Sequence, residues 1–245
     1  MIKVVPVDKT SGESIYTIDQ LNDIQGKTIV LSPEYSTLIF SAKPLKSQGK
    51  VAAKVDVGDL SSELDRILVK GLPNIKPGTG VVIKTLLTEV KTDDSTIGYM
   101  YKINGLANVE SVDNGIATCR VIYNYQEINK DDIVDDTMKG IAPLVIKPAV
   151  NNNIAMTSIL DVWNNCAGGG NGDVIFIASG SKKGVKQGDI INLYKPVAVK
   201  DGKKPKTIYE PIGNAIVLQA VENSSMALIT YSLMYIEEGF SASGK

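Results

Sequence analysis

The side chains that could do chemistry in this chain are carboxylates, lysines and thiols, because its 245 residues include no histidine. Histidine titrates nearest to neutral pH and is the commonest metal ligand. Ser-His-Asp and Cys-His catalysis are therefore excluded, as is any zinc or iron site that needs imidazole. A carboxylate pair, a lysine Schiff base or a calcium site of acidic residues remains open. We expect a protein without catalytic residues, bound metal or cofactor.

The densest group of carboxylates is the segment Asp131–Asp136. Calcium needs several converging oxygens, but the spacing of an EF-hand loop and its final glutamate are missing here. The adjacent pair Glu237 and Glu238 does not suit glycoside cleavage, since neighbours on a strand point to opposite faces. We expect a solvated acidic turn at 131–136, with weak calcium binding as the alternative.

Two other motifs favour structural roles. The glycine run Gly168–Gly172 lacks the Lys-Ser/Thr pair and the following helix of a phosphate-binding loop, so we interpret it as a flexible linker. The two cysteines, Cys119 and Cys166, are too few and too distant in sequence for a zinc site. Cys119 lies in an apolar, strand-like run, which favours free buried thiols over a disulfide.

Four tyrosines form the candidate partner-binding surface, namely Tyr99, Tyr101, Tyr123 and Tyr125. The two members of each pair are two residues apart, so they lie on one face of a strand. An exposed aromatic face binds a protein partner or stacks on a glycan. The alternative, which we favour, is a half-buried face that packs against an N-terminal layer. The single tryptophan, Trp163, has the same two interpretations.

The composition sets limits on partners. The chain is 43% hydrophobic and 22% charged, as in ordinary soluble globular proteins. Its 26 basic residues nearly balance its 27 acidic ones, so no overall field attracts nucleic acid or an anionic membrane. No window approaches the ~20 apolar residues of a membrane span. The segment Met1–Pro6 lacks the apolar stretch of a secretory signal, and a signal upstream of it remains open.

Short runs rich in Val, Ile, Leu and Tyr, bounded by turn residues, predict a mostly β chain. The one segment that we expect to be helical is Ile154 to Asn164, where apolar residues fall near one face. The predicted strands include residues 27–31, 66–69, 80–86, 174–177, 190–194, 215–221 and 225–231.

An internal repeat organises these strands. Four short segments recur in the same order in both halves of the chain, the first and last at one offset of 108 residues and the middle two shifted by loop insertions. The matching segments are Asp65–Val69 with Asp173–Ile177, Ile75–Gly78 with Val185–Gly188, Ile97-Gly98 with Ile212-Gly213, and Thr118–Tyr123 with Met226–Tyr231. About five short antiparallel strands with long hairpins are typical of a small barrel that closes its own edges.

The repeat predicts two tandem small β-barrel modules. We expect an N-terminal β segment over residues 1–60 that docks on the first module, and the first module itself over residues 61–140. A linker with a short helix is expected over residues 141–172, and the second module over residues 173–245.

Several short motifs resemble a known family. The segments Asp65–Gly71, Ile97–Tyr99, Tyr125–Asp132, Gly180–Asp189 and Ser224–Thr230 resemble the region that follows the LysM domain in many bacterial envelope proteins. That region is similar to the C-terminal domain of flagellar assembly protein T and occurs in the type IV pilus secretin-associated protein. The resemblance covers nearly the whole chain and implies SH3-like β-barrels.

The resemblance also implies a function. It implies a non-enzymatic protein of the periplasm or cell envelope that scaffolds or anchors a secretion, pilus or flagellar assembly. Its partners are then proteins of that assembly or further copies of the chain. No LysM motif precedes the modules here, so peptidoglycan binding does not carry over. A cell-wall glycan-binding module, with tyrosine or tryptophan exposed in a groove, is the alternative. A hydrolase would instead need two carboxylates within ~5–10 Å in a cleft.

Overall fold

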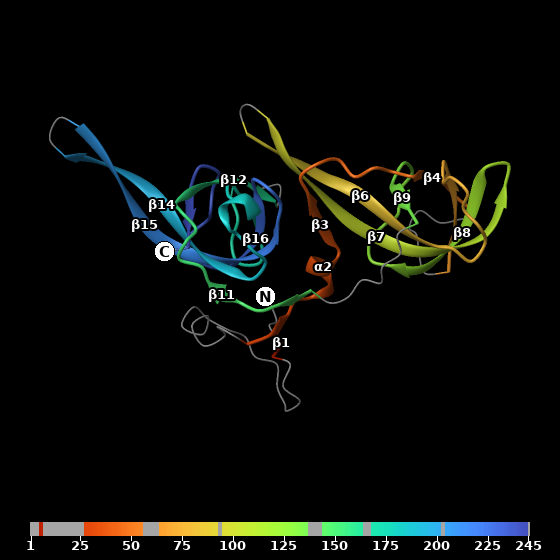
Figure 1. Ribbon diagram of the computed structural model, residues 1–245, viewed down its shortest axis with the longest axis horizontal. Helices are drawn as coiled ribbons and strands as arrows, with labels where there is room; N and C mark the ends of the chain where they lie inside the picture. The colour runs from red at the N-terminus through yellow and green to blue at the C-terminus, as the bar shows by residue number, and fades with distance from the viewer. Residues whose placement is uncertain are drawn as a thin grey trace.

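The chain forms two closed six-stranded β-barrels that lie side by side, so the predicted fold of two tandem small barrels is confirmed (Figure 1). The computed structural model describes residues 5–6, 27–55, 64–92, 95–136, 144–163, 168–201 and 204–244. Most of these residues lie in strands, with one four-residue helix, α2 (Pro33–Ser36), and one 3₁₀ turn (Ser181–Lys183).

All strand pairs of the first barrel are antiparallel, in the order β7-β6-β9-β4-β5-β8, and the pairing of β7 with β8 closes it. A further strand, β3 (Leu38–Ser41), is added to the outside of β7. The strands of the barrel are β4 (Gly49–Lys54), β5 (Arg66–Lys70), β6 (Gly80–Lys91), β7 (Thr96–Asp113), β8 (Ile116–Asn124) and β9 (Ile133–Asp135).

The second barrel has the order β15-β14-β17-β12-β13-β16, and the pairing of β15 with β16 closes it. Its additional strand, β11 (Ala149–Val150), runs parallel to β14. The strands of the barrel are β12 (Thr157–Trp163), β13 (Val174–Ile177), β14 (Asp189–Asp201), β15 (Lys204–Ala220), β16 (Ser225–Ser232) and β17 (Ser241–Ser243).

A three-stranded sheet joins the N-terminal segment to the connection between the barrels. It pairs β2 (Ile29–Val30) with β1 (Val5–Pro6) on one side and β10 (Val145–Ile146) on the other. Within the segment 1–60, only β1 and β2 belong to this sheet, whereas β3 and β4 are strands of the first barrel's own sheet. The part of that segment that forms β3 and β4 is thus built into the sheet of the first module, whereas β1 and β2 pair with the connection between the barrels.

The internal repeat extends over all six strands of each barrel. The two strand orders become identical when β4 to β9 are matched with β12 to β17. One backbone hydrogen bond shows the equivalence. Val51 N donates to Asp132 O in the first barrel, and Ile159 N donates to Phe240 O in the second, so donor and acceptor are each shifted by 108 residues. The sequence comparison therefore missed two equivalent pairs of strands, β4 with β12 and β9 with β17, because these strands are short and share few residue types.

One predicted equivalence, that of Gly98 with Gly213, is wrong, and Gly105 takes the place of Gly98. A Cβ atom at Gly105 would lie 2.8 Å from Tyr123 O, and one at Gly213 would lie 2.3 Å from Tyr231 O. Both contacts are with the backbone of the next strand, so any side chain would push the two strands apart. Glycine is required at this point because the backbone of the paired strand occupies the space that a Cβ atom would need.

The helix predicted over Ile154–Asn164 is also wrong, since this segment contains strand β12. Ile159 and Val162 contact the core inside the second barrel, whereas Leu160 and Trp163 pack against a separate core between the barrels. A bulge after Ile159 shifts the pairing with β13. Apolar residues therefore occur on both faces of β12, and this removes the alternation of period two that marks a half-buried strand.

The interpretation of Gly168–Gly172 as a flexible linker is wrong as well. Gly169 and Ile236 exchange backbone hydrogen bonds of 2.8 Å in both directions, and Gly172 N donates to Ile229 O at 2.9 Å. A Cβ atom at Gly169 would lie 2.5 Å from a methyl carbon of Val162. The glycines let this segment pack against the second barrel rather than lend it mobility.

A shared apolar core joins the two barrels. Phe40 and Met100 of the first module and Phe176 and Met226 of the second belong to one cluster of buried side chains. The ring centroids of Phe40 and Phe176 are 5.1 Å apart. Because such a cluster is close-packed like a domain interior, we interpret the two barrels as one rigid body.

The side chain of Gln219 closes the exposed edge of β3. Its amide accepts a hydrogen bond from Phe40 N and donates one to Leu38 O, both at 2.7 Å. These bonds replace the pairing that another strand would make there. Ser224 adds a third polar link between the modules, since its hydroxyl donates to Ile97 O at 3.2 Å.

Candidate functional site

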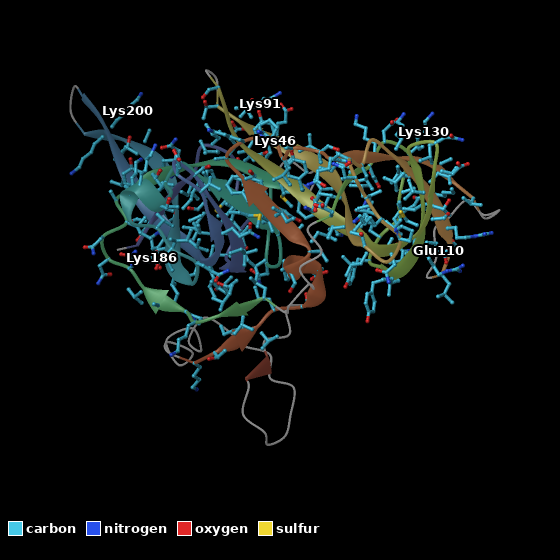
Figure 2. The ribbon with its side chains drawn as sticks, turned by 45° about the vertical axis from the view of Figure 1, so that its right-hand side comes forward. Lys46, Lys91, Glu110, Lys130, Lys186 and Lys200 are labelled. Carbon is cyan, nitrogen blue, oxygen red and sulfur yellow. The ribbon has the colours of Figure 1, made fainter. Side chains whose placement is uncertain are left out.

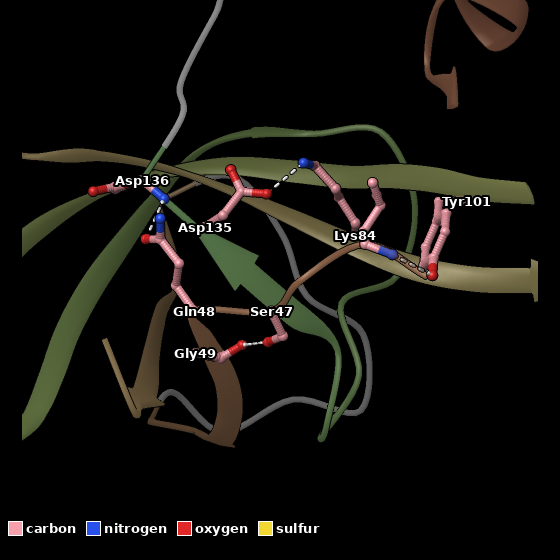
Figure 3. Close-up of polar contacts among 8 residues, drawn as sticks. Ser47, Gln48, Gly49, Lys84, Tyr101, Asp135 and Asp136 are labelled. Atoms are coloured by element: carbon pink, nitrogen blue, oxygen red, sulfur yellow. Dashed lines mark hydrogen bonds and ion pairs between the residues drawn. The ribbon is translucent and has the colours of Figure 1, made fainter. Parts of the chain in front are cut away.

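The structure divides the four candidate tyrosines into a packed pair and an exposed pair. Tyr99 is half-buried and Tyr101 is buried, and the Tyr101 hydroxyl accepts a hydrogen bond from Leu45 N at 3.0 Å (Figure 3). Tyr123 and Tyr125 are 51% and 39% exposed, and their rings stack with centroids 6.3 Å apart. The packed interpretation therefore applies to Tyr99 and Tyr101 on β7, while Tyr123, on β8, and Tyr125, just after it, offer an aromatic surface.

Two hairpin arms extend beyond the barrels toward the same side of the molecule (Figure 1). One is the distal part of the β6–β7 hairpin, and the other is the ribbon of β14 and β15 between Tyr194 and Pro211. Lys91 lies on the first arm and Lys200 on the second (Figure 2). Pairing in the second arm continues to Asp201 opposite Lys204, so this ribbon is about 20 Å long.

The β14–β15 arm carries exposed apolar side chains on both faces. Val199 is 39% exposed and Ile208 48%, and Val197 lies directly opposite Ile208, so these three share one face. Tyr209 is 45% exposed and lies on the other face. Large apolar side chains on a ribbon that projects into solvent are typical of a surface that binds a partner.

A second exposed apolar feature follows β16. The consecutive side chains of Leu233, Met234 and Tyr235 are 69%, 37% and 71% exposed. Two exposed carboxylates, Glu237 and Glu238, follow after the buried Ile236. We call residues 233–238 the acidic loop. The equivalent loop of the first barrel begins at Tyr125, which corresponds to Leu233. Both barrels therefore expose a large side chain just after the equivalent strands β8 and β16.

A cleft of about 320 Å³ lies between the acidic loop, β12 and the arm of the first barrel. Carboxylates dominate its charge, because Glu89, Asp161 and Glu238 line it together with one lysine, Lys91. Lys91 forms an ion pair with Glu89 at 3.1 Å. Burial raises the pKa of Asp161, and a hydrogen bond from Val162 N opposes this shift. The cleft thus favours a cation.

A second cleft, of about 300 Å³, lies where α2, β7 and the second barrel meet, and the only tryptophan of the chain lies in its wall. The Tyr35 hydroxyl donates to Gly172 O at 3.0 Å across this junction. Burial, followed by the charge of Glu34, raises the pKa of Tyr35 to about 12, so the hydroxyl keeps its proton. The lining residues are Glu34, Tyr35, Leu38, Lys102, Trp163, Asn171, Gly172 and Asp173.

The acidic segment 131–136 serves the structure of the first barrel. Asp132 is only 6% exposed and accepts hydrogen bonds from Asn129 N and Asn104 Nδ2, both at 2.8 Å. The prediction of a solvated turn is therefore wrong for Asp132. Asp135 forms an ion pair with Lys84, which is itself buried (Figure 3). No group of three or more His, Cys, Asp or Glu side chains in the described part of the chain is arranged to hold a metal ion.

Asp131 has a positive φ of 70°, which non-glycine residues rarely adopt. Its counterpart in the second barrel is Gly239, with a φ of 83°. The turn before the last strand therefore has the same conformation in both barrels. In the first barrel an aspartate takes the position that suits glycine.

The prediction of a free buried thiol is confirmed for Cys119, which is fully buried and forms no disulfide. Burial, followed by the charge of Glu110, raises the pKa of this thiol to about 12. A protonated, inaccessible thiol is a core side chain rather than a nucleophile. Cys166 lies outside the described residues.

Sequence reasoning missed the arm faces, the acidic loop and both clefts. Only the acidic loop has a local signal, since three large apolar residues follow strand β16 without a polar residue between them. The clefts combine segments that are far apart in sequence, so no spacing predicts them. Among the helices of the described residues, none has the length and apolar character needed to cross a membrane. No protein-family model matches this chain, and no curated protein matches it either.

Proposed function

We propose that this chain is a non-enzymatic interaction scaffold of the bacterial cell envelope that anchors a secretion, pilus or flagellar assembly. The shared core carries this proposal, because it fixes both hairpin arms to one body. A scaffold must hold its contact surfaces at a constant distance and orientation, and two barrels on a flexible linker would not do so. The envelope location rests on the family resemblance of the short motifs.

The surface of the arms supports protein binding. A two-stranded ribbon is only marginally stable in water when nothing covers its faces. The β14–β15 arm nevertheless keeps its pairing as far as Asp201 and Lys204, with Ile208 and Tyr209 exposed. Aromatic and aliphatic side chains of this kind form the centre of protein interfaces. A partner that covers the arm would stabilise it.

The buried charged groups form ion pairs and hydrogen bonds with their neighbours, and this also supports a non-enzymatic role. Lys84 is paired with Asp135, and Asp132 accepts several hydrogen bonds inside the first barrel. A general base or nucleophile needs a group that can reach a substrate, and these groups are already bound to their neighbours. The charges thus hold β6, β7 and β9 together.

The test is site-specific photo-crosslinking in bacteria that express the full chain. A photoreactive phenylalanine analogue at Tyr209, on the arm, is expected to crosslink to a component of an envelope-spanning ring or fibre. The same analogue at Lys130, an exposed position on the far barrel, serves as the matched control (Figure 2). Equal crosslinking from both positions, or crosslinks to cytosolic proteins alone, would contradict the proposal.

A cell-wall glycan-binding role is the second candidate, and the cleft at Trp163 favours it. Sugar rings stack on indole faces, and polar side chains around them bind the hydroxyl groups. Among the described residues, the Lys102 ammonium and the Trp163 indole N–H make no hydrogen bond or ion pair with the protein, so both are available to a ligand. Asn171 is exposed at the rim of the same cleft.

Tryptophan fluorescence tests this second role directly, because Trp163 is the single tryptophan. Titration with soluble N-acetylglucosamine oligomers is expected to shift its emission, and Lys102→Ala is expected to weaken the binding about tenfold. Tyr125→Ala, outside the cleft, is the control and should leave the titration unchanged. An emission spectrum that does not change up to millimolar oligosaccharide would rule out this role.

A further inference from the structure

The β14–β15 arm is a ribbon that carries exposed apolar side chains. From Lys195 to Glu210 its two strands pair only with each other within the part of the chain that the structure describes. One face exposes Val199 and Ile208, and the other exposes Tyr209. The arm points away from both barrels, so it does not fold back on its own molecule (Figure 1).

The charge of this arm is strongly positive. The sequence from Tyr194 to Pro211 contains five lysines and only two carboxylates, Asp201 and Glu210. A partner surface that fits this arm is therefore apolar and acidic. Electrostatic complementarity of this kind selects partners and sets their register more than it adds affinity.

The acidic loop of this same chain has the complementary properties. Leu233, Met234 and Tyr235 are exposed, and the carboxylates of Glu237 and Glu238 follow them. The stretch from Tyr231 to Gly239 contains no lysine or arginine. The arm and the loop thus match each other in both apolar character and charge.

The cleft beside the acidic loop adds a receptor for a lysine. Glu238 and Asp161 line it from two elements of the second barrel, and Glu89 lines it from the first. Its volume of about 320 Å³ is enough to admit a lysine side chain. Only Lys91 offsets the three carboxylates, so a further ammonium group is favourable there.

We infer that the β14–β15 arm of one copy docks on the acidic loop of a second copy, with a lysine of the arm in the neighbouring acidic cleft. This inference rests on the proposed scaffold function and names the partner of its arm. Each copy carries one arm and one acidic loop. The contact therefore repeats head to tail, or closes reciprocally as a two-fold dimer.

Charge reversal with rescue tests the contact. Light scattering after size-exclusion chromatography measures the mass of the purified chain over a wide concentration range. The wild type is expected to assemble, and K200E/K206E and E237K/E238K are each expected to weaken assembly about 100-fold through like-charge contacts. All four substitutions in one chain restore opposite charges and are expected to restore assembly. E127K, at the equivalent corner of the first barrel, is the matched control.

Loss of assembly must be distinguished from loss of folding. Circular dichroism and thermal unfolding of every variant separate lost assembly from lost folding, since all five positions are at the surface. A wild-type chain that stays monomeric at the highest concentration overturns the inference, as does unchanged assembly of the reversed variants. Crosslinking of Tyr209 to a different envelope protein in cells, together with a monomeric chain, overturns the second-copy contact alone and leaves the scaffold function standing.

Discussion

Replacing Phe176 by alanine is expected to lower the free energy of unfolding by about 3–5 kcal/mol and to separate the unfolding of the two barrels. Its side chain is fully buried, and its ring contacts that of Phe40 from the first module. The substitution leaves a cavity in the core that couples the barrels, while the interior core of each barrel is retained. Differential scanning calorimetry should show one transition for the wild type and two for the variant.

Two control variants make this result specific. Tyr123→Ala removes an exposed aromatic ring and should change the unfolding free energy by about 0.5 kcal/mol or less. Phe176→Leu keeps most of the apolar volume and should retain one transition. Two transitions in the wild type would contradict the rigid coupling of the barrels, and a single sharp transition in Phe176→Ala would show that other contacts suffice.

The shared core explains why apolar spacing predicted most strands but not β12. A strand with one buried face shows alternating apolar residues, as in β5, where Ile67 and Val69 are fully buried. Strand β12 separates two cores, so Ile159 packs inside the barrel and Leu160 packs outside it. The second face is determined by the partner barrel, which local spacing does not reveal. The shared core thus both couples the two modules and removes the alternation of apolar residues by which β12 would be recognised as a strand.

For the four candidate tyrosines, too, local spacing does not reveal which side chains a distant segment covers. The spacing of two residues placed Tyr99 with Tyr101 and Tyr123 with Tyr125 in the same way. Their burial differs because β3 pairs with β7 and the chain after β3 covers Tyr101, whereas Tyr123 on β8 and Tyr125 just after it remain exposed. The face of a strand can be predicted from sequence, but its covering depends on contacts with distant segments.

The two barrels have a polar pair of buried side chains and an apolar pair at equivalent positions. In the first barrel, Asn104 and Asp132 are buried and bonded to each other. Residues 108 positions later are Ile212 and Phe240, which belong to the apolar core of the second barrel. The same fold therefore tolerates a buried carboxylate with its partners or two hydrophobic side chains at this site.

Asp132→Ala is expected to lower the unfolding free energy of the chain by about 3 kcal/mol. The substitution removes one of the two acceptors of the Asn104 amide, which is 2% exposed, and leaves it only the Thr85 hydroxyl oxygen. The Asn104 Oδ1 atom already has no hydrogen-bond partner in the protein. Asn129 N and the Thr85 hydroxyl also lose an acceptor. Chemical denaturation monitored by circular dichroism measures the loss.

Transplanting the apolar pair should cost much less than breaking the polar one. The two substitutions are Asn104→Ile and Asp132→Phe. Each substitution made alone breaks the bond between Asn104 and Asp132 and leaves one buried polar side chain next to a new apolar one. Both together remove the donor and the acceptor of that bond and supply the two apolar side chains found in the second barrel. A double-mutant cycle is therefore expected to give a favourable coupling of about 1–3 kcal/mol. The reverse pair, Ile212→Asn with Phe240→Asp, is the matched comparison in the second barrel. If the losses of unfolding free energy in the two single variants simply add up in the double variant, the pair has no coupling. The backbone of the first barrel, and not the contact between the two side chains, would then require polar residues at these positions.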